Sequence, residues 1–337
     1  MTEVDLELSG RPLLATPTDQ RLFVDRTAEL ERIERAVRSR TNTLVVGHRG
    51  VGKTTLLRIA EDRVRQSERT VWIEGQLATD PVEVIALIRY RVNPRERADW
   101  PAFAEGAASF QYRSRPQSQR LLEMLDGLRK SLERRGGSWV VFVDELTSAD
   151  VAHTLFGRLR DELWQLPLTW VVSGNAADRQ TLLRPPADAF FPNVVNVEPL
   201  DERGALELLR KRVPDPKGSD QLLRAIVAEA DGIPRRLILL ANDAFVAGGD
   251  VAATAHRRAR RDAAIAELGE AAARVAAELE ANGPASASDD QFLARLGMGR
   301  SRAAQVLSAL ERAGVVTGAT DRSSAGPRRK VYSLVER

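Results

Sequence analysis

The chain has 337 residues, 43% of them hydrophobic, so we expect two or three domains with apolar cores of their own. Its 50 basic and 47 acidic residues give a net charge of only +3, which excludes a disordered polyelectrolyte. No apolar run is long enough to span a membrane, the first residues lack a signal-peptide core, and cysteine is absent. These features predict a cytoplasmic protein without disulfides or thiolate metal sites.

The basic residues are not evenly distributed. Between Gln291 and Arg337 nine basic residues stand against three acidic ones, a local net charge of +6 that leaves −3 for the rest of the chain. Only five of the 50 basic residues are lysines, and heavy use of arginine is by itself a weak sign of nucleic-acid binding. The concentration of charge at one end of the chain is the more informative feature.

The first 200 residues alternate between apolar runs and helical periodicity. Residues 1–20, with Pro12 and Pro17, predict an irregular arm, and a helix follows over 27–38 with Asp25 or Thr27 as its cap. The predicted strands cover 43–46, 70–74, 139–143, 169–172 and 193–197, and the predicted helices between them cover 54–65, 81–90, 119–135 and 151–165. Unbroken apolar strands alternating with helices predict an α/β domain over 21–200, whose parallel sheet is covered on both faces.

Residues 91–119 interrupt this alternation. They place aromatic side chains, among them Trp100, Phe103, Phe110 and Tyr112, between several arginines. Aromatic and arginine side chains together can stack on nucleic-acid bases. The simpler interpretation is a surface insertion whose aromatic rings pack against the domain, and the sequence leaves both open.

The strand pattern stops near residue 200. Helical periods over 201–213, 219–231 and 233–247 predict a small helical domain spanning 201–255. A connecting helix over 256–281 then leads into a last domain, to residue 337, with helices over 289–296 and 301–313. Two short strands over 315–317 and 330–334 predict a final hairpin.

One motif carries clear chemistry. Residues 47–54, GHRGVGKT, match the pattern GxxxxGK[ST] between a predicted buried strand and a predicted helix. Glycines in such a phosphate loop let successive backbone N–H groups point at phosphate oxygens. Lys53 is then expected to reach the β- and γ-phosphates of ATP, and the Thr54 hydroxyl is expected to bind Mg²⁺.

Two further strands end in polar residues. Asp144 and Glu145 follow the apolar run 139–143, and they predict an acid that holds Mg²⁺ and an acid that polarises the attacking water. Asn175 follows the strand 169–172, where it would orient that water or act only as a turn residue. In a parallel sheet these strand ends lie beside the ligand.

These motifs resemble, in order, the nucleotide site of AAA+ ATPases of the origin-recognition and replication-initiator type. Phe23-Val24-Asp25-Arg26 is similar to the motif that opens their ATPase domain, and Gly232-Ile233-Pro234-Arg235 to their sensor 2 motif. The resemblance implies a P-loop AAA+ parallel sheet sandwiched by helices, a small helical lid, a C-terminal winged-helix domain and a homo-oligomer in the ATP state. The nucleotide-binding residues it implies are Phe23, Val24, Gly47, Gly50, Val51, Gly52, Lys53, Thr54, Thr55, Pro234 and Arg235.

An arginine that completes a neighbouring subunit's site is also implied. Arg184 is the nearest match, with Arg179 as the alternative, although the residues after Arg184 depart from the family pattern. The same architecture resembles transposition ATPases and the STAND-like NTPases of signalling and anti-phage defence. The resemblance therefore leaves the biological process open.

The last domain predicts a helix-turn-helix followed by a wing. The second helix, 301–313, begins at Ser301, which is expected to cap it, and it would enter the major groove of double-stranded DNA. The residues expected to contact DNA are Arg300, Arg302, Gln305, Arg322, Arg328, Arg329 and Lys330. Winged helices also dock proteins, so protein docking is the alternative.

Together these observations predict an ATP-binding and ATP-hydrolysing, Mg²⁺-dependent switch that binds DNA and loads or regulates a partner on it. The alternative is a STAND-like signalling or defence NTPase, or a transposition regulator, whose winged helix docks a protein. DNA binding discriminates between the two classes.

Overall fold

The computed structural model describes residues 8, 10–77, 80–94, 116–213, 220–245, 251–321 and 329–335. They belong to two compact units, residues 1–242 and 243–337. Residues 95–115 of the predicted insertion, with all four of its named aromatic residues, lie outside the described part. Among the described helices, none has the length and apolar character needed to cross a membrane.

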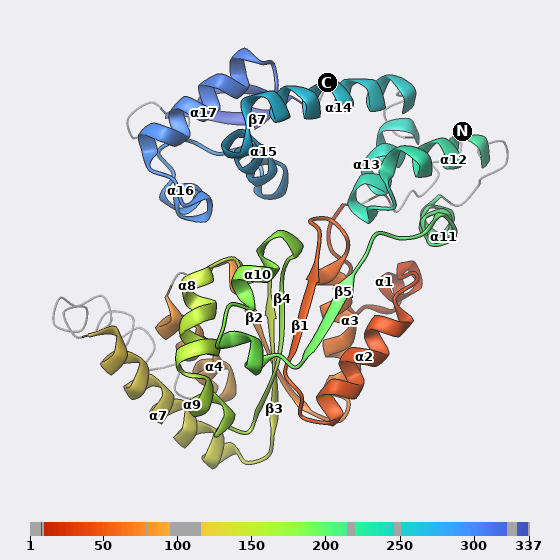
Figure 1. Ribbon diagram of the computed structural model, residues 1–337. Coiled ribbons are helices and arrows are strands. Elements are labelled where there is room, and N and C mark those ends of the chain that lie inside the picture. The colour runs from red at the N-terminus through yellow and green to blue at the C-terminus, as the bar shows by residue number, and fades with distance from the viewer. Residues whose placement is uncertain are drawn as a thin grey trace. The chain divides into compact units, whose positions relative to one another are not determined.

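The described part of the first unit contains a five-stranded parallel sheet in the order β2-β3-β4-β1-β5 (Figure 1). Its strands are β1 (Thr43–Gly47), β2 (Arg69–Glu74), β3 (Trp139–Asp144), β4 (Leu168–Asn175) and β5 (Asn193–Val197). All five strands were predicted to within three residues at each end. The α/β class with a parallel sheet is confirmed.

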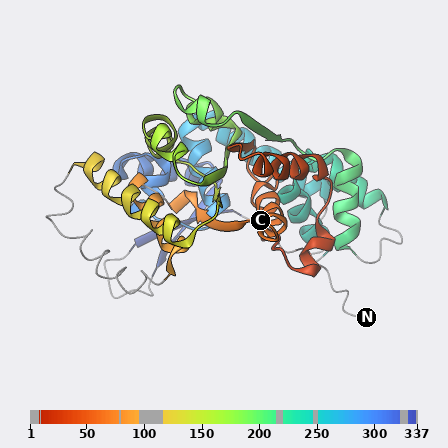
Figure 2. The ribbon, with the colours of Figure 1, turned by 90° about the horizontal axis from the view of Figure 1, so that it is seen from below.

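Helices cover both faces of this sheet. On one face lie α2 (Thr27–Arg38) and α3 (Lys53–Arg65); on the other lie α4 (Pro81–Val92), α7 (Gln117–Arg135), α8 (Ala149–Ala152) and α9 (Arg160–Trp164). Figure 2 shows the yellow helix α7 and the red-orange helices α2 and α3 on opposite sides of the strands. Strand β3 supplies both cores, since Val141 and Val143 pack on one face and Val140 and Phe142 on the other. This double burial explains its unbroken apolar sequence.

The N-terminal arm contains more structure than we expected. Helix α1 (Pro17–Leu22) begins inside the region predicted to be irregular, because Thr16 accepts a hydrogen bond from the Asp19 N–H and Pro17 suits the first helical position. The predicted caps of α2 are wrong. Its N-cap is Arg26, which makes no side-chain cap hydrogen bond, and Asp25 precedes the helix with a φ of +46°.

The helix predicted over 151–165 is broken in the structure. A π-helical turn, η3 (His153–Arg158), separates α8 from α9, and its consecutive residues Leu155, Phe156 and Gly157 are all buried. Phe156 packs there against Phe190, with ring centroids 5.0 Å apart. The tertiary packing of these apolar residues overrides the regular helical period. The short elements η1 (Gly75–Leu77), η4 (Ala176–Asp178), α10 (Arg179–Leu182) and η5 (Ala187–Phe190) complete this region.

Three helices follow the sheet: α11 (Glu202–Arg212), α12 (Asp220–Ala230) and α13 (Pro234–Phe245). A tight turn before α13 connects them to the end of the sheet. The Leu200 N–H donates to the Gly232 carbonyl at 2.8 Å, and Gly232 has a φ of +67°. A Cβ at this glycine would stand 2.0 Å from the Leu200 carbonyl oxygen. Only glycine fits this turn, which places α13 beside the sheet.

We therefore expect Gly232→Ala to destabilise the first unit by about 2–3 kcal/mol, through backbone strain and the displaced Leu200 contact. Gly137→Ala is the matched control, because Gly137 has a φ of +72° but no atom closer than 4.0 Å to the added Cβ. It should cost only about 1 kcal/mol. Urea unfolding followed by tryptophan fluorescence measures this unit alone, since all five tryptophans lie within residues 1–242. Equal losses in the two variants would show that the close contact carries no energy.

The second unit combines helices with a hairpin. Its elements are α14 (Val251–Leu268), α15 (Glu270–Asn282), α16 (Asp290–Leu296), α17 (Arg300–Arg312) and the antiparallel strands β6 (Val316–Asp321) and β7 (Arg329–Leu334). Residues from α15, α16, α17 and both strands share one apolar core. Two predictions are wrong here: Gly269, with a φ of +84°, splits the expected connecting helix, and Gly299 rather than Ser301 is the N-cap of α17.

Candidate nucleotide site

The predicted polar residues of the first unit meet at the carboxyl edge of its sheet. In the register, Gly47 at the end of β1 pairs with Asn175 of β4, and Glu74 of β2 pairs with Asp144 of β3. Parallel strands present their carboxyl ends at one edge, where open α/β sheets bind ligands. The phosphate loop, Asp144, Glu145 and Asn175 therefore surround one site.

The phosphate loop, residues 47–54, takes a conformation that needs its glycines. Gly50 and Gly52 have φ values of +79° and +102°, and a Cβ at Gly47 would stand 2.6 Å from the Val197 carbonyl oxygen. Helix α3 begins at Lys53, so the last two residues of the loop form its first turn. The loop N–H groups and the positive end of the helix dipole together favour a phosphate group.

Lys53 is held inside the loop. Only 9% of the residue is exposed, and its Nζ donates to the carbonyl oxygens of Gly47 at 2.8 Å and His48 at 3.1 Å. Burial lowers the pKa of Lys53, whereas the negative charges of Glu145 and Asp144 act in the opposite direction. The ammonium group thus lies within electrostatic reach of both acids, at the mouth of the predicted phosphate site.

Asp144 is the buried acid of the site. It is 5% exposed, and burial raises its pKa, while hydrogen bonds from Thr54 and Ser173 oppose that rise. Mg²⁺ prefers oxygen ligands, and a hydroxyl in contact with a carboxylate provides two. Its other ligands are usually water molecules and phosphate oxygens of the substrate. Thr54 and Asp144 therefore fit the predicted metal role. No group of three or more His, Cys or carboxylate side chains able to hold a metal ion by itself occurs among the described residues.

Glu145 occupies a backbone conformation that is unusual for a residue with a side chain. Its φ is +56°, in the left-handed region, and its N–H donates to the Ser173 Oγ at 2.8 Å. Such conformations cost about 1–3 kcal/mol and persist only where the surroundings enforce them, often at functional sites. The half-buried Glu145 is thus fixed in place by a neighbouring strand.

Asn175 ends β4, where the structure shows the turn role considered for it; orientation of a water molecule stays a prediction. Its Oδ1 accepts the Ala177 N–H at 3.2 Å and so caps η4, as a turn residue does. The amide N–H groups and the second lone pair of Oδ1 remain able to hydrogen-bond a water molecule. At the end of η4, burial raises the pKa of Asp178, and the charge of Lys53 opposes that rise. Asp178 therefore lies near the site, although no motif in the sequence points to it.

Helix α13 brings a further predicted residue to the loop. The Arg235 N–H donates to the Gly50 carbonyl at 3.2 Å, and a Cβ at Gly50 would stand 3.0 Å from the Arg235 Cβ. The charge of Arg235 contributes to lowering the pKa of Lys53. Pro234 and Arg235 are both half-buried at the start of this helix. The structure thus brings Arg235 and the phosphate loop together.

The remaining predicted residues of the nucleotide set lie at the start of the domain, in the phosphate loop and in the first turn of α3. The Phe23 carbonyl accepts a hydrogen bond from Lys211 Nζ at 3.0 Å, and Val24 is buried. Thr55 Oγ1 accepts the Leu13 N–H at 3.2 Å, so the N-terminal arm contacts the first turn of α3. Val51 is buried inside the loop.

The two arginine candidates lie in one exposed region. Arg179 is the first residue of α10, and Arg184 follows that helix in the connection to η5. Both residues are exposed, as a group that reaches a neighbouring subunit must be.

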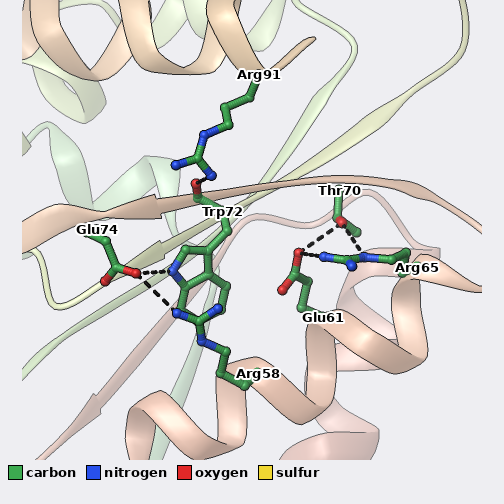
Figure 3. A network of polar contacts seen from close by, with 7 residues as sticks. All are labelled: Arg58, Glu61, Arg65, Thr70, Trp72, Glu74 and Arg91. Atoms are coloured by element: carbon green, nitrogen blue, oxygen red, sulfur yellow. Dashed lines mark hydrogen bonds and ion pairs between the residues drawn. The ribbon is translucent and has the colours of Figure 1, made fainter. Parts of the chain in front are cut away.

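A polar cluster fixes the edge strand β2 to α3, the helix that carries Lys53 (Figure 3). The Arg58 guanidinium lies 3.9 Å from the Trp72 ring centroid. Glu74 Oε1 accepts hydrogen bonds from Trp72 Nε1 at 2.8 Å and from Arg58 at 3.1 Å, and Arg91 donates to the Trp72 carbonyl at 2.7 Å. Nearby, Glu61 accepts from Thr70 at 3.0 Å and pairs with Arg65. Arg58 thereby partly neutralises Glu74, the acid beside Asp144.

In the second unit, helix α17 separates into a buried and an exposed face. Ala303, Val306, Leu307 and Leu310 are buried, whereas Arg300, Arg302 and Gln305 are exposed. Lys330 pairs with Glu311 at 2.6 Å, and this hydrogen bond raises the pKa of Lys330. Arg322, Arg328 and the side chain of Arg329 lie outside the described part. Of the residues predicted to contact DNA, the exposed arginines that the structure describes are therefore those on the first half of α17.

Comparison with known proteins supports the geometry of the first unit. Residues 22–172 match the family model of the AAA ATPase domain. The Orc1 protein of Aeropyrum pernix, solved in complex with DNA, is similar with 18% identity and a TM-score of 0.54, over 93% of this chain and 89% of that one. A Walker-type ATPase of Pyrococcus abyssi is similar with 16% identity and a TM-score of 0.51, over 97% of this chain and 96% of that one. The chain therefore has the P-loop AAA+ fold, and its residues 22–172 are similar to AAA ATPase domains.

Proposed function

We propose that the chain binds and hydrolyses ATP with Mg²⁺. The observation that carries this proposal is the meeting of the phosphate loop, Asp144, Glu145 and Asn175 at one edge of the sheet. Each of these groups serves a separate need of phosphoryl transfer, from binding phosphate to directing water.

The chemistry follows from the groups present. The Lys53 ammonium, which bonds to loop carbonyls in this structure, would exchange them for β- and γ-phosphate oxygens. Thr54 and Asp144 would hold Mg²⁺, which when bound offsets phosphate charge. The Glu145 carboxylate would accept a hydrogen bond from the attacking water and so polarise it. The Asn175 amide N–H would donate a hydrogen bond to the same water. Arg235 would stabilise charge on the γ-phosphate.

We further propose that residues 256–337 form a winged helix that binds double-stranded DNA. The support is the exposed Arg300, Arg302 and Gln305 on a helix whose opposite face is packed. The likeness to an Orc1 protein solved with DNA agrees with this partner. On this view the chain is a cytoplasmic, ATP-dependent switch that loads or regulates a partner on DNA, and Arg184 completes the site of a neighbouring copy in the ATP state.

A specific observation favours the competing function. Lys330 at the base of the hairpin is neutralised by Glu311, so this part of the surface offers less charge to phosphate than the sequence suggested. A winged helix with a less basic surface suits docking of a protein. In that case the chain is a signalling or defence NTPase or a transposition regulator.

Replacing Lys53 tests the nucleotide site. We expect Lys53→Ala to raise the Kd for Mg·ATP at least about tenfold, because charge-assisted hydrogen bonds to phosphate are lost. Titration with a fluorescent ATP analogue in the presence of Mg²⁺ measures this constant. Lys130→Ala is the control, since Lys130 is exposed on α7 and pairs only at the surface with Asp126. If both variants bound ATP as the unaltered chain does, the site would be assigned to the wrong residues.

A further inference from the structure

We propose that Ser173 is a positioning residue for ATP hydrolysis, which holds Asp144 and Glu145 in their working geometry. The proposal rests on the proposed ATPase function. Ser173 lies on β4, two residues before Asn175, and is fully buried. It has no part in the motifs that the sequence analysis recognised.

Ser173 contacts three consecutive residues at the end of β3. Its Oγ donates to Asp144 Oδ1 at 2.9 Å and accepts the Glu145 N–H at 2.8 Å. Its carbonyl oxygen accepts the Leu146 N–H at 2.8 Å. A serine hydroxyl has one proton to donate and lone pairs to accept, so a single side chain meets both the acid expected to hold the metal and the backbone of the acid expected to direct water.

These contacts begin where the regular pairing of the two strands ends. The register between β3 and β4 runs from Trp139↔Leu168 to Val143↔Val172 and goes no farther. Asp144 and Glu145 therefore lie just beyond the last paired residues. Beyond the last paired residues, the Ser173 hydroxyl hydrogen-bonds the Asp144 carboxylate and the Glu145 N–H, and so holds both residues to β4.

The backbone conformation of Glu145 depends on its contact with Ser173. A left-handed backbone at a glutamate is strained, and it persists only if neighbouring groups enforce it. The hydrogen bond from the Glu145 N–H to Ser173 Oγ acts directly on this peptide, beside the bond from the Leu146 N–H to the Ser173 carbonyl. Without the hydroxyl the peptide is held less tightly, and the Glu145 carboxylate moves away from the position from which it would polarise water.

The same hydroxyl orients Asp144. Its hydrogen bond fixes Oδ1, while Thr54 bonds to the same carboxylate from the phosphate loop. Removal of the hydroxyl leaves a buried carboxylate oxygen without this donor and frees the side chain to rotate. The geometry offered to Mg²⁺ is then less well defined, whereas the loop that binds the phosphates is unchanged.

The test compares Ser173→Ala with Thr169→Val. Both remove a buried hydroxyl from β4, but Thr169 pairs with Val140, at the opposite end of the strand from the acids. We expect Ser173→Ala to lower kcat about ten- to thirtyfold and to raise the Mg²⁺ concentration for half-maximal rate severalfold. The KM for ATP should change less than threefold, because Lys53 and the loop remain. Thr169→Val should leave all three values within about twofold.

The readouts separate positioning from loss of structure. Unfolding midpoints followed by tryptophan fluorescence show whether each variant is folded at the assay temperature. If folded Ser173→Ala kept the unaltered kcat and Mg²⁺ dependence, or if Thr169→Val lost as much activity, the positioning role would be overturned. If the unaltered chain hydrolysed no ATP, the proposed function would fail. This result is distinguishable from failure of the positioning role, because it is seen in the unaltered chain before any variant is compared with it.

Discussion

Turnover of ATP should fall by about two to three orders of magnitude in Glu145→Gln, while Mg·ATP binding survives. Glutamine has nearly the shape of glutamate, so the hydrogen bond from the residue 145 N–H to Ser173 Oγ and the left-handed backbone are retained. The change removes the carboxylate charge that would polarise the attacking water. Lys53, Thr54 and Asp144 remain to bind the phosphates and the metal ion.

Single-turnover and steady-state ATPase assays measure this loss, and titration with a fluorescent ATP analogue measures binding. Glu133→Gln on the exposed face of α7 is the matched control and should hydrolyse ATP at the unaltered rate. The Glu145→Gln variant should also accumulate the ATP-bound state, which sizing by mass photometry would detect as a multimer. Unchanged turnover would reduce Glu145 to a residue that merely ends its strand.

The parts of the site that the sequence revealed are those encoded locally. The phosphate loop is a continuous motif with a required strand before it and helix after it, so Lys53 and Thr54 could be placed from the sequence alone. Asp144 and Asn175 follow apolar strands whose parallel pairing was itself predictable, and parallel strands bring their ends together.

The parts that the sequence did not reveal depend on contacts between distant segments. In the sequence, Ser173 is one residue of a predicted strand region with no motif of its own. Only the pairing of β3 with β4 places it beside Asp144, 29 positions earlier. In the sequence, Lys330 adds to the positive charge of the C-terminal region. In the structure this charge is paired with Glu311. Neither pairing leaves a local pattern, because each follows from how two elements pack.

The predictions of helix ends and of unbroken helices were wrong for a related reason. The connecting helix breaks at Gly269, a position where glycine alone does not distinguish a tolerated residue from a helix end. In η3 the aromatic packing of Phe156 decides the helical geometry. Local propensity is a weak prior in both cases, and packing overrides it.

Removal of the exposed charge on α17 should weaken DNA binding more than removal of equal charge elsewhere in the second unit. Arg300 and Arg302 lie in the first turn of this helix and are both exposed. Each phosphate contact contributes about 0.9 to the slope of log affinity against log salt. Arg300→Ala/Arg302→Ala should therefore reduce the slope by about 1.8 and the affinity by roughly sixtyfold at 0.1 M salt.

The control is Arg274→Ala/Arg312→Ala, which removes the same charge from exposed positions on α15 and at the far end of α17. Its slope should fall by less than half as much, because net charge alone acts only over a screened distance. Gel-shift or fluorescence-anisotropy titrations of a short DNA duplex at several salt concentrations measure both variants. ATPase activity without DNA should survive in each, since the nucleotide site lies in the first unit. Equal slopes for the two pairs would remove α17 as the contact with DNA and would make protein docking the better account of this unit.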